Sequence, residues 1–159
     1  MSLASVREWL ASHAPEARLI EAHASTATVA DAAAALQVAP GRIAKTLAIR
    51  ANGRVLLLVT RGDARLDNGK SKAAFGGRPR MLAPEETQEL TGHPVGGVCP
   101  FGLATPLPVY CDESLRAFAT VFPAAGSRNS SVEIAPMRLA ELTGATWVDT
   151  CLLPDENAA

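Results

Sequence analysis

The chain has 159 residues and a formal net charge of −1, from 15 basic and 16 acidic side chains. That length suits one domain with a sizeable core, and a hydrophobic fraction of 48% with 19% charged residues excludes global disorder. The charge is uneven, because residues 42–80 hold ten basic and two acidic side chains, a local charge of +8, and the rest carries −9. The composition therefore excludes a uniformly basic nucleic-acid binder but allows a polar molecule with one positive face.

Membrane, secretory and metal signals are absent from the sequence. No apolar run approaches the roughly 20 residues of a membrane span, and residues 1–8 lack the apolar core of a secretory signal. Cys99, Cys111 and Cys151 are odd in number and widely spaced, which favours reduced thiols in the cytoplasm over a disulfide framework. Because no Cys-x-x-Cys or His-x-x-x-His pair occurs, we expect no metal and no cofactor.

The first part of the chain is predicted to contain a helix from Ser2 to about His13 and a strand from Arg18 to Glu21. A second helix is predicted to be capped by Thr28 and to end at Leu36. Two aliphatic runs, 43–49 and 55–59, then flank Asn52-Gly53, the strongest hairpin signal in the chain. The second run does not alternate between apolar and polar residues, so its strand is predicted to be central and buried on both faces.

Short elements follow, and in chain order they are a helix at 68–75, a strand at 80–82, a helix at 84–90, a strand at 107–111, a short helix at 113–118, strands at 120–122 and 132–134, a helix that Pro136 opens and Gly144 ends, and a strand at 146–148. Residues 91–102 form a glycine- and proline-rich loop of the kind that often carries function. About seven short strands and five helices without strict alternation predict a mixed α/β (α+β) fold, a single domain over residues 1–153 with a frayed tail at 154–159.

Residues 64–71, Ala-Arg-Leu-Asp-Asn-Gly-Lys-Ser, match a relaxed phosphate-loop pattern. A true phosphate loop follows a parallel strand and presents successive backbone N–H groups to the phosphates. Here Asp67 places an anion in that position, and the preceding strand belongs to the predicted hairpin. The pattern therefore does not favour nucleotide hydrolysis.

Three candidate groups each have a functional and a structural interpretation. Lys45 shares a strand face with aliphatic residues, so its ammonium either extends to a sheet edge or points into a pocket toward a phosphate or a carbonyl. Cys99 is either a nucleophile with His93 as its base or, the favoured interpretation, a small apolar side chain in a wall. Gly96 and Gly97 form either an oxyanion nest or a plain tight turn.

An ordered set of blocks resembles the YbaK/EbsC family of aminoacyl-tRNA deacylases, which is related to the editing domain of bacterial prolyl-tRNA synthetases. The blocks are Ala33-Ala34-Ala35-Leu36 with Ile43-Ala44-Lys45-Thr46-Leu47, Gly62-Asp63 with Arg65, Asp67 and Lys70, Thr91-Gly92 with residues 95–102, Asp112-Glu113, Ala124-Ala125-Gly126-Ser127 and Trp147-Val148-Asp149. The resemblance covers about residues 3–150. It implies one compact α/β domain with a mixed, partly barrel-like sheet.

The resemblance also implies a function, the hydrolysis of the ester between a wrong, small amino acid and the 3′-terminal adenosine of tRNA. We expect trans-editing in the cytoplasm, with tRNA for proline as the carrier and prolyl-tRNA synthetase as a possible partner. The amino acid stays open between alanine, serine, threonine and small non-protein residues, because the family's polar residues near Glu21 and Ser131 are replaced here. The alternatives are a non-catalytic module that binds tRNA or a synthetase, and a thiol hydrolase that uses Cys99.

The residue roles follow by position. Lys45, Gly96 and Gly97 are the predicted catalytic residues, with Lys45 near the substrate carbonyl or terminal phosphate and the glycine loop as the oxyanion donor. The predicted substrate-binding residues are Thr46, Val98, Cys99, Pro100, Gly126 and Ser127. Arg65, Lys70 and Lys72 are predicted to contact tRNA as part of a positive rim. No general base is evident, and placement of the substrate is expected to supply part of the rate.

Overall fold

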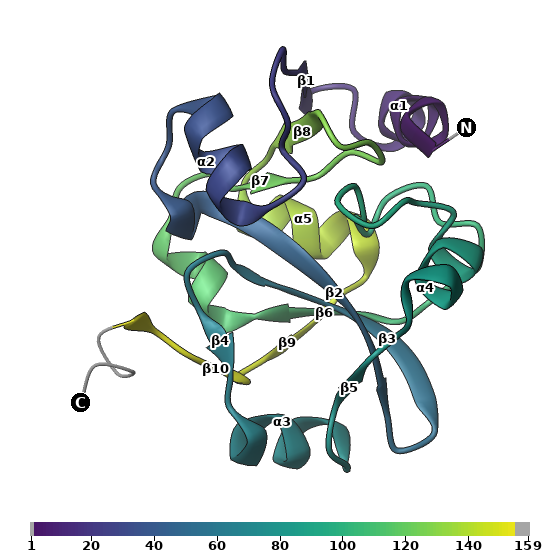
Figure 1. Ribbon diagram of the computed structural model, residues 1–159, viewed down its shortest axis with the longest axis vertical. Helices are drawn as coiled ribbons and strands as arrows, with labels where there is room; N and C mark the ends of the chain where they lie inside the picture. The colour runs from purple at the N-terminus through teal and green to yellow at the C-terminus, as the bar shows by residue number, and fades with distance from the viewer. Residues whose placement is uncertain (1, 155–159) are drawn as a thin grey trace.

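The structure, a computed structural model, describes residues 2–154 of the chain (Figure 1). The helices are α1 (Ser2–His13), α2 (Val29–Leu36), η1 (Pro40–Arg42), α3 (Asn68–Phe75), α4 (Pro84–Thr91), η2 (Glu113–Ala117) and α5 (Pro136–Thr143). The strands are β1 (Arg18–Glu21), β2 (Ile43–Ala51), β3 (Arg54–Arg61), β4 (Arg65–Leu66), β5 (Arg80–Met81), β6 (Val109–Asp112), β7 (Phe122–Pro123), β8 (Ser130–Glu133), β9 (Thr146–Val148) and β10 (Cys151–Leu152). Of the predicted frayed tail, residues 155–159 lie outside the described part.

The main sheet has six strands in the order β5-β2-β3-β6-β9, with β7 as a second neighbour of β2. β2 and β3 form the predicted antiparallel hairpin, and β6 and β9 add to it in parallel. On its other edge, β2 pairs with β5 at Ile49 and Arg50, and with β7 at Ile43 and Ala44. Within the described chain no strand is paired with that edge of β2 between these two partners, so the sheet is split there.

The sheet is mixed, as predicted, but the partly barrel-like sheet that the resemblance implies is not a closed barrel. The main sheet ends at β5 on one side and at β9 on the other, and two separate ribbons, β1-β8 and β4-β10, lie beside it. Isolated bridges from Val121 to Ile134 and from Ala124 to Ser131 connect β7 with β8. The described residues contain ten strands rather than about seven, because strands as short as β4 and β10 have no readable alternation.

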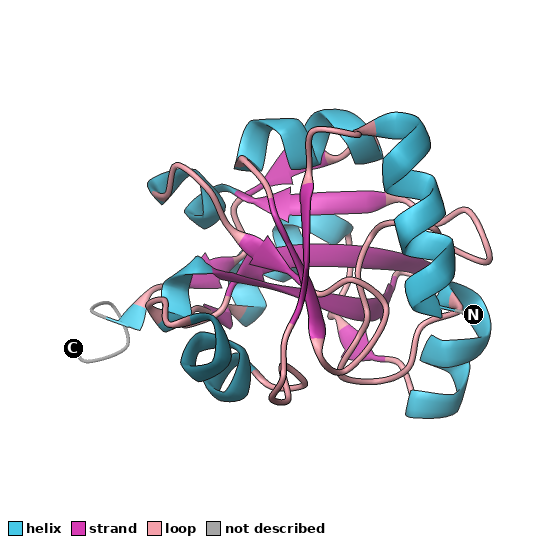
Figure 2. Ribbon diagram, turned by 90° about the horizontal axis from the view of Figure 1, so that it is seen from above, coloured by secondary structure: helices cyan, strands magenta, loops and turns pink. Residues whose placement is uncertain are grey.

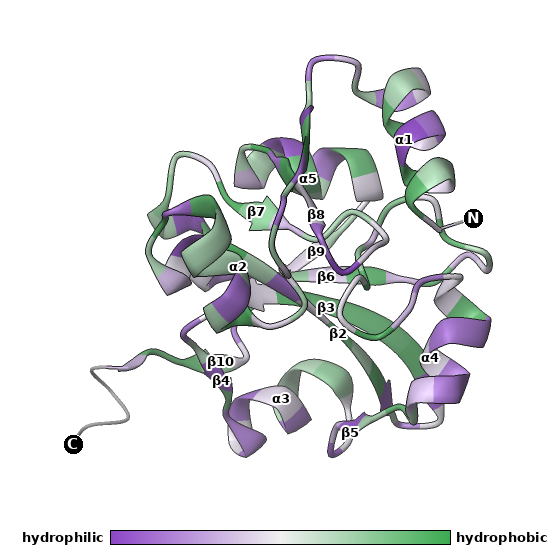
Figure 3. Ribbon diagram, turned by 45° about the horizontal axis from the view of Figure 1, so that its top comes forward, coloured by the Kyte–Doolittle hydropathy of each residue, from purple (hydrophilic) through white to green (hydrophobic). Residues whose placement is uncertain are grey.

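The hairpin strands form the centre of the core. On one face of β3, Leu57 and Val59 belong to the same apolar cluster as residues of α1 and α5. On the other face, Leu56 and Leu58 pack with Phe75 of α3. These four β3 side chains are at most 2% exposed, which confirms the prediction of a strand buried on both faces. Figure 3 shows β2 and β3 as the most continuous hydrophobic strands, and Figure 2 shows the helices around them.

Side-chain caps explain where α2 and α3 begin. The hydroxyl of Thr28 accepts a hydrogen bond from the backbone N–H of Asp31, and the carboxylate of Asp67 accepts one from Lys70. Such caps contribute about 1 kcal/mol each. Asp67 thus occupies the helix N-terminus that a phosphate would need, which agrees with the exclusion of a phosphate loop. Among residues 2–154, no helix is long and apolar enough to cross a membrane.

Candidate functional site

A cavity of about 260 Å³ opens where the edge of β2 is split between β5 and β7. Its walls come from five parts of the chain, namely the segment before and in α2, strand β2, the β5–α4 connection, the loop after α4, and the β7–β8 region. The lining residues are Thr26, Ala27, Thr28, Val29, Ala32, Ile43, Ala44, Lys45, Thr46, Ala48, Met81, Leu82, Pro84, Thr87, Val95, Gly96, Val98, Phe122, Ala124 and Ser131. A small, mostly apolar cavity with a few polar groups is typical of a site for a small organic group.

Lys45 is a charged residue among those that line this cavity. Its side chain is half-buried, and its Nζ donates a hydrogen bond of 2.6 Å to the backbone carbonyl of Ala64. Desolvation lowers the pKa of Lys45, while the anionic forms of Cys151 and Asp63 nearby oppose that decrease. The ammonium is therefore held against the β3–β4 connection.

A charged pair lies behind Lys45. The carboxylate of Asp63 accepts two hydrogen bonds from Arg61, of 2.6 and 2.8 Å, and these bonds lower the pKa of Asp63. The guanidinium of Arg61 in turn lies 4.9 Å from the ring centre of Phe118. Because this pair belongs to the connection that also supplies the carbonyl of Ala64, it holds the partner of Lys45 in position.

The loop of residues 94–100, called the glycine loop below, forms another wall. Gly96 and Val98 line the cavity, and Gly96 has a positive φ of 93°, which favours glycine. The N–H of Gly97 donates to the carbonyl of Pro94 at 2.9 Å, so this N–H closes a turn. An oxyanion role for the Gly97 N–H would require that bond to break, whereas Gly96 is placed at the cavity itself.

The two small-residue segments that the sequence singles out lie against each other. The N–H of Gly126 donates to the carbonyl of Gly97 at 3.0 Å. A Cβ atom on Gly97 would lie 2.7 Å from the backbone nitrogen of Ser127, so only glycine permits this approach. Gly126 and Ser127 therefore support the glycine loop from behind rather than lining the cavity.

Cys99 does not have the surroundings of a nucleophile. Its side chain is fully buried, and burial raises the pKa of its thiol to about 12. The Nε2 atom of His93 lies 2.7 Å from the carbonyl oxygen of Phe101 and 3.6 Å from the Cys99 sulfur. Since a carbonyl can only accept, Nε2 carries a proton and cannot take one from the thiol. Cys99 and Pro100 are buried residues of the glycine loop itself, which fits the interpretation of Cys99 as a small apolar side chain in a wall.

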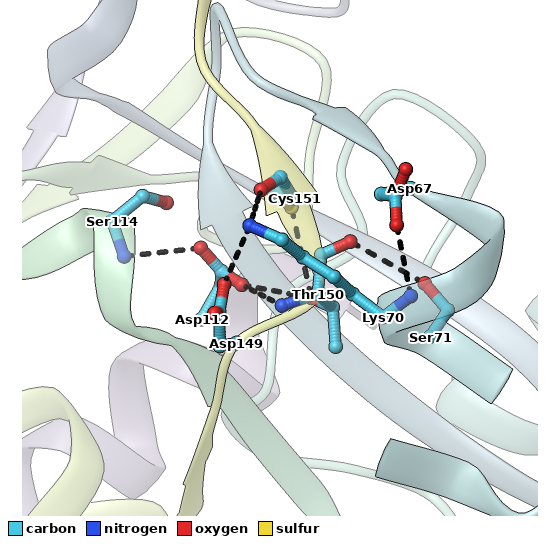
Figure 4. Close-up of polar contacts among 8 residues, drawn as sticks. All are labelled: Asp67, Lys70, Ser71, Asp112, Ser114, Asp149, Thr150 and Cys151. Carbon is cyan, nitrogen blue, oxygen red and sulfur yellow. Dashed lines mark hydrogen bonds and ion pairs between the residues drawn. The ribbon is translucent and has the colours of Figure 1, made fainter. Parts of the chain in front are cut away.

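The residues predicted to bind tRNA lie away from the cavity, on β4 and α3. Arg65 is in β4, and Lys72 is exposed on α3. The ammonium of Lys70 donates to the carboxylate of Asp149 at 3.2 Å and to the carbonyl of Cys151 at 3.1 Å (Figure 4). Lys70 thus joins α3 to the segment around β10. Their role in tRNA binding stays a prediction.

Several cavity residues carry no sequence signal. Within the described chain, the buried hydroxyl oxygens of Thr26 and Thr46 have no hydrogen-bond partner. Met81 and Val95, at 59% and 47% exposed, are large apolar side chains among the lining residues. The family blocks include Thr46 and Val95 but not Thr26 or Met81, because the cavity forms from segments that are far apart in sequence. In residues 2–154 no group of three or more His, Cys, Asp or Glu side chains is placed to hold a metal ion.

Most of the chain is similar to proteins connected with the editing of aminoacyl-tRNA. The family model described as the aminoacyl-tRNA editing domain matches residues 23–142. The uncharacterized protein YwhH of Bacillus subtilis is 49% identical over 153 residues, which cover 95% of this chain and 98% of YwhH. The proline–tRNA ligase of Moorella thermoacetica is 41% identical over 86 residues, 54% of this chain and 15% of the ligase. A crystal structure of a candidate trans-editing enzyme for prolyl tRNA synthetase superposes with a TM-score of 0.86 at 37% identity, over 94% of this chain and 96% of that chain. The chain therefore belongs to the YbaK-type family of aminoacyl-tRNA editing domains.

Proposed function

We propose that this protein is a trans-editing deacylase that hydrolyses the ester between a small, wrong amino acid and the 3′ end of a tRNA. The observation that carries the proposal is the small cavity in which Lys45 and Gly96 line the same space. The apolar residues of α2 and β7 suit a small side chain, and the opening at a sheet edge lets the tRNA remain outside. The enzyme would work in the cytoplasm, where mischarged tRNA arises.

The reaction needs a water molecule, a stabilised oxyanion and exact placement. Water attacks the ester carbonyl carbon and a tetrahedral oxyanion forms; the bond to the ribose oxygen then breaks as that oxygen takes the proton that the attacking water releases. The ammonium of Lys45 and the backbone at Gly96 and Val98 are the groups of the cavity that can face this charge. In low-dielectric surroundings such groups stabilise a developing charge by several kcal/mol, on the order of 3 kcal/mol for one donor.

The hydroxyls of Thr26 and Thr46 support a polar contact with the aminoacyl group. A buried hydroxyl without a partner costs about 1–3 kcal/mol, and a side-chain rotation that meets the amino group of a bound ester would remove that cost. The sequence identity of 41% with a segment of a proline–tRNA ligase supports tRNA for proline as the carrier. In that case the cavity must accept residues smaller than proline or equal to it in size.

The proposal is tested with a panel of tRNAs for proline that are charged with alanine, serine, threonine, 2-aminobutyrate or proline. We expect release of at least one small amino acid and no release of proline. Lys45→Ala should lower kcat/KM by about 10²-fold to 10³-fold, because a charge-stabilising group is removed. Arg54→Ala is the matched control, since Arg54 is an exposed cation at the hairpin turn, away from the cavity.

The outcomes separate the candidate functions. If no charged tRNA is hydrolysed, the protein is not a deacylase. If tRNA binds but hydrolysis is absent, and Lys45→Ala weakens only binding, a non-catalytic binding module is the correct description. Circular dichroism of the Lys45→Ala variant shows whether the fold is intact and so excludes a purely structural effect.

A further inference from the structure

His93 is a buried polar residue that the proposed chemistry does not use. Its side chain is 0% exposed. Its Nε2 atom lies 2.7 Å from the carbonyl oxygen of Phe101, and its Nδ1 atom lies 2.5 Å from the hydroxyl of Ser2 in α1. His93 directly precedes the glycine loop and Phe101 directly follows it. The hydrogen bond between His93 and Phe101 therefore joins the two ends of the loop.

These contacts determine the form of the imidazole. Nε2 donates its proton to the carbonyl of Phe101, and Nδ1 then accepts the proton of the Ser2 hydroxyl. Desolvation lowers the pKa of His93, although the bond to Phe101 opposes that change. The ring is therefore neutral at neutral pH, with one donor and one acceptor that are both used. The thiol of Cys99 completes the cluster, 3.7 Å from the same carbonyl.

The first turn of α1 contacts the site at two further points. A Cβ atom on Gly126 would lie 2.7 Å from the carbonyl oxygen of Ser2, and one on Gly102 would lie 3.0 Å from the carbonyl oxygen of Ser5. Trp9 of the same helix lies 5.5 Å from Phe101 between ring centres. The start of α1 thus packs against Gly126, whose N–H binds the glycine loop, and against Gly102, which lies just after the loop.

We propose that His93 is a positioning residue whose neutral imidazole links the two ends of the glycine loop to the first turn of α1, and that this link holds Gly96 and Val98 at the cavity wall. The inference rests on the proposed function for its effect on turnover. It does not require His93 to touch the substrate, because Ser2, Cys99 and Phe101 surround the ring. Displacement of a catalytic loop by about 1 Å can cost up to 10²-fold in rate.

The test uses three variants of the full chain. His93→Phe keeps a ring of similar shape but removes both nitrogens, His93→Gln keeps a donor near the position of Nε2, and Ser2→Ala removes only the helix contact. His23→Gln is the control, because His23 is exposed and lies outside the cavity. We measure kcat and KM on the charged tRNA that the wild type hydrolyses best.

A second measurement needs no substrate. Because Cys99 lies inside the glycine loop and is fully buried, its alkylation by N-ethylmaleimide under native conditions reports on opening of the loop. Mass spectrometry of the peptides distinguishes it from Cys111 and Cys151, which are buried in β6 and β10 and report on global unfolding.

For His93→Phe we expect a decrease in kcat of about tenfold or more with KM nearly unchanged, and faster alkylation of Cys99 alone. His93→Gln should restore most of the wild-type kcat and most of the protection of Cys99 from alkylation. Ser2→Ala should give values of kcat and of the Cys99 alkylation rate between those of wild type and His93→Phe. Wild-type kcat and wild-type Cys99 alkylation in His93→Phe would overturn the proposal, as would an equal increase at all three cysteines. If His93→Phe does not fold, the Ser2→Ala variant decides by the same criteria. Failure of the tRNA panel would refute the proposed function alone, because the alkylation result still tests the link.

Discussion

A thiol with a pKa of about 12 is protonated at neutral pH and is therefore a poor nucleophile. Cys99 is in this state because it is a fully buried residue of the glycine loop. The imidazole beside it, that of His93, has its Nε2 atom hydrogen-bonded to the carbonyl of Phe101. At the scale of single residues, burial and one committed hydrogen bond decide that the pair Cys99–His93 is structural.

Replacing Cys99 by alanine should therefore leave turnover nearly unchanged. We expect kcat within about twofold of wild type and a loss of about 1–2 kcal/mol in the free energy of unfolding, because a small buried side chain is shortened. The measurements are deacylation of the best charged tRNA and urea unfolding. A loss of turnover of more than about tenfold in a folded variant would restore the thiol hydrolase.

Lys45 shows where residue-level reasoning from the sequence stops. Its place on a strand face among aliphatic residues could be predicted, and both an edge position and a pocket position were consistent with it. In the structure Lys45 lies in the part of β2 between the partners β5 and β7 and lines the cavity that opens there. The carbonyl of Ala64, which holds the ammonium, comes from a different strand connection and has no signal in the sequence around Lys45.

At the scale of elements, the glycine loop and α3 contain glycines with opposite roles. A Cβ atom on Gly97 would be 2.7 Å from the backbone of Ser127, whereas one on Gly69 of α3 would lie 3.4 Å from a carboxylate oxygen of Asp67. The first contact cannot be relieved without moving the loop, but the second is an ordinary contact. The family resemblance assigns a role to Gly97 and none to Gly69, but it does not show that the backbone of Ser127 leaves no room for a side chain at Gly97.

The two positions give a matched pair of Gly→Ala variants. Gly97→Ala should lower kcat by about tenfold or more, because the cavity wall is displaced. Gly69→Ala should leave kcat unchanged and stabilise the protein by about 0.4–1 kcal/mol, since alanine favours a helix and restricts the unfolded chain. Both are measured by deacylation kinetics and thermal unfolding. Equal activities of the two variants would contradict the role given to the glycine loop.

At the scale of the whole molecule, residues 42–80 form a less positive surface than their formal charge of +8 suggests. Several of its cations are paired with carboxylates, and the pairs are Arg42–Glu133, Arg50–Glu86, Arg61–Asp63 and Lys70–Asp149. Three of these partners come from outside the stretch, from α4, β8 and the segment before β10. The fold therefore neutralises part of the basic stretch, which favours a small footprint on the 3′ end of tRNA over a wide contact.

This charge distribution predicts a moderate dependence on salt. For contacts with about two or three phosphates of a single strand, the logarithm of affinity should fall with the logarithm of salt concentration with a slope of about −2. The measurement is KM for the charged tRNA, or binding of uncharged tRNA, between about 50 and 200 mM KCl. Affinity that does not change over this range would contradict electrostatic steering to the site.

Local structure and family membership could both be predicted from the amino-acid sequence. The cap at Thr28, the Asn52-Gly53 turn and the apolar run of β3 act within a few residues, so short windows predict them correctly. The tertiary structure decided the cavity at the split edge of β2, the short ribbons β1-β8 and β4-β10, and the link from His93 to α1. Each of these joins segments that are far apart in the chain, and such contacts depend on three-dimensional packing that no local pattern encodes.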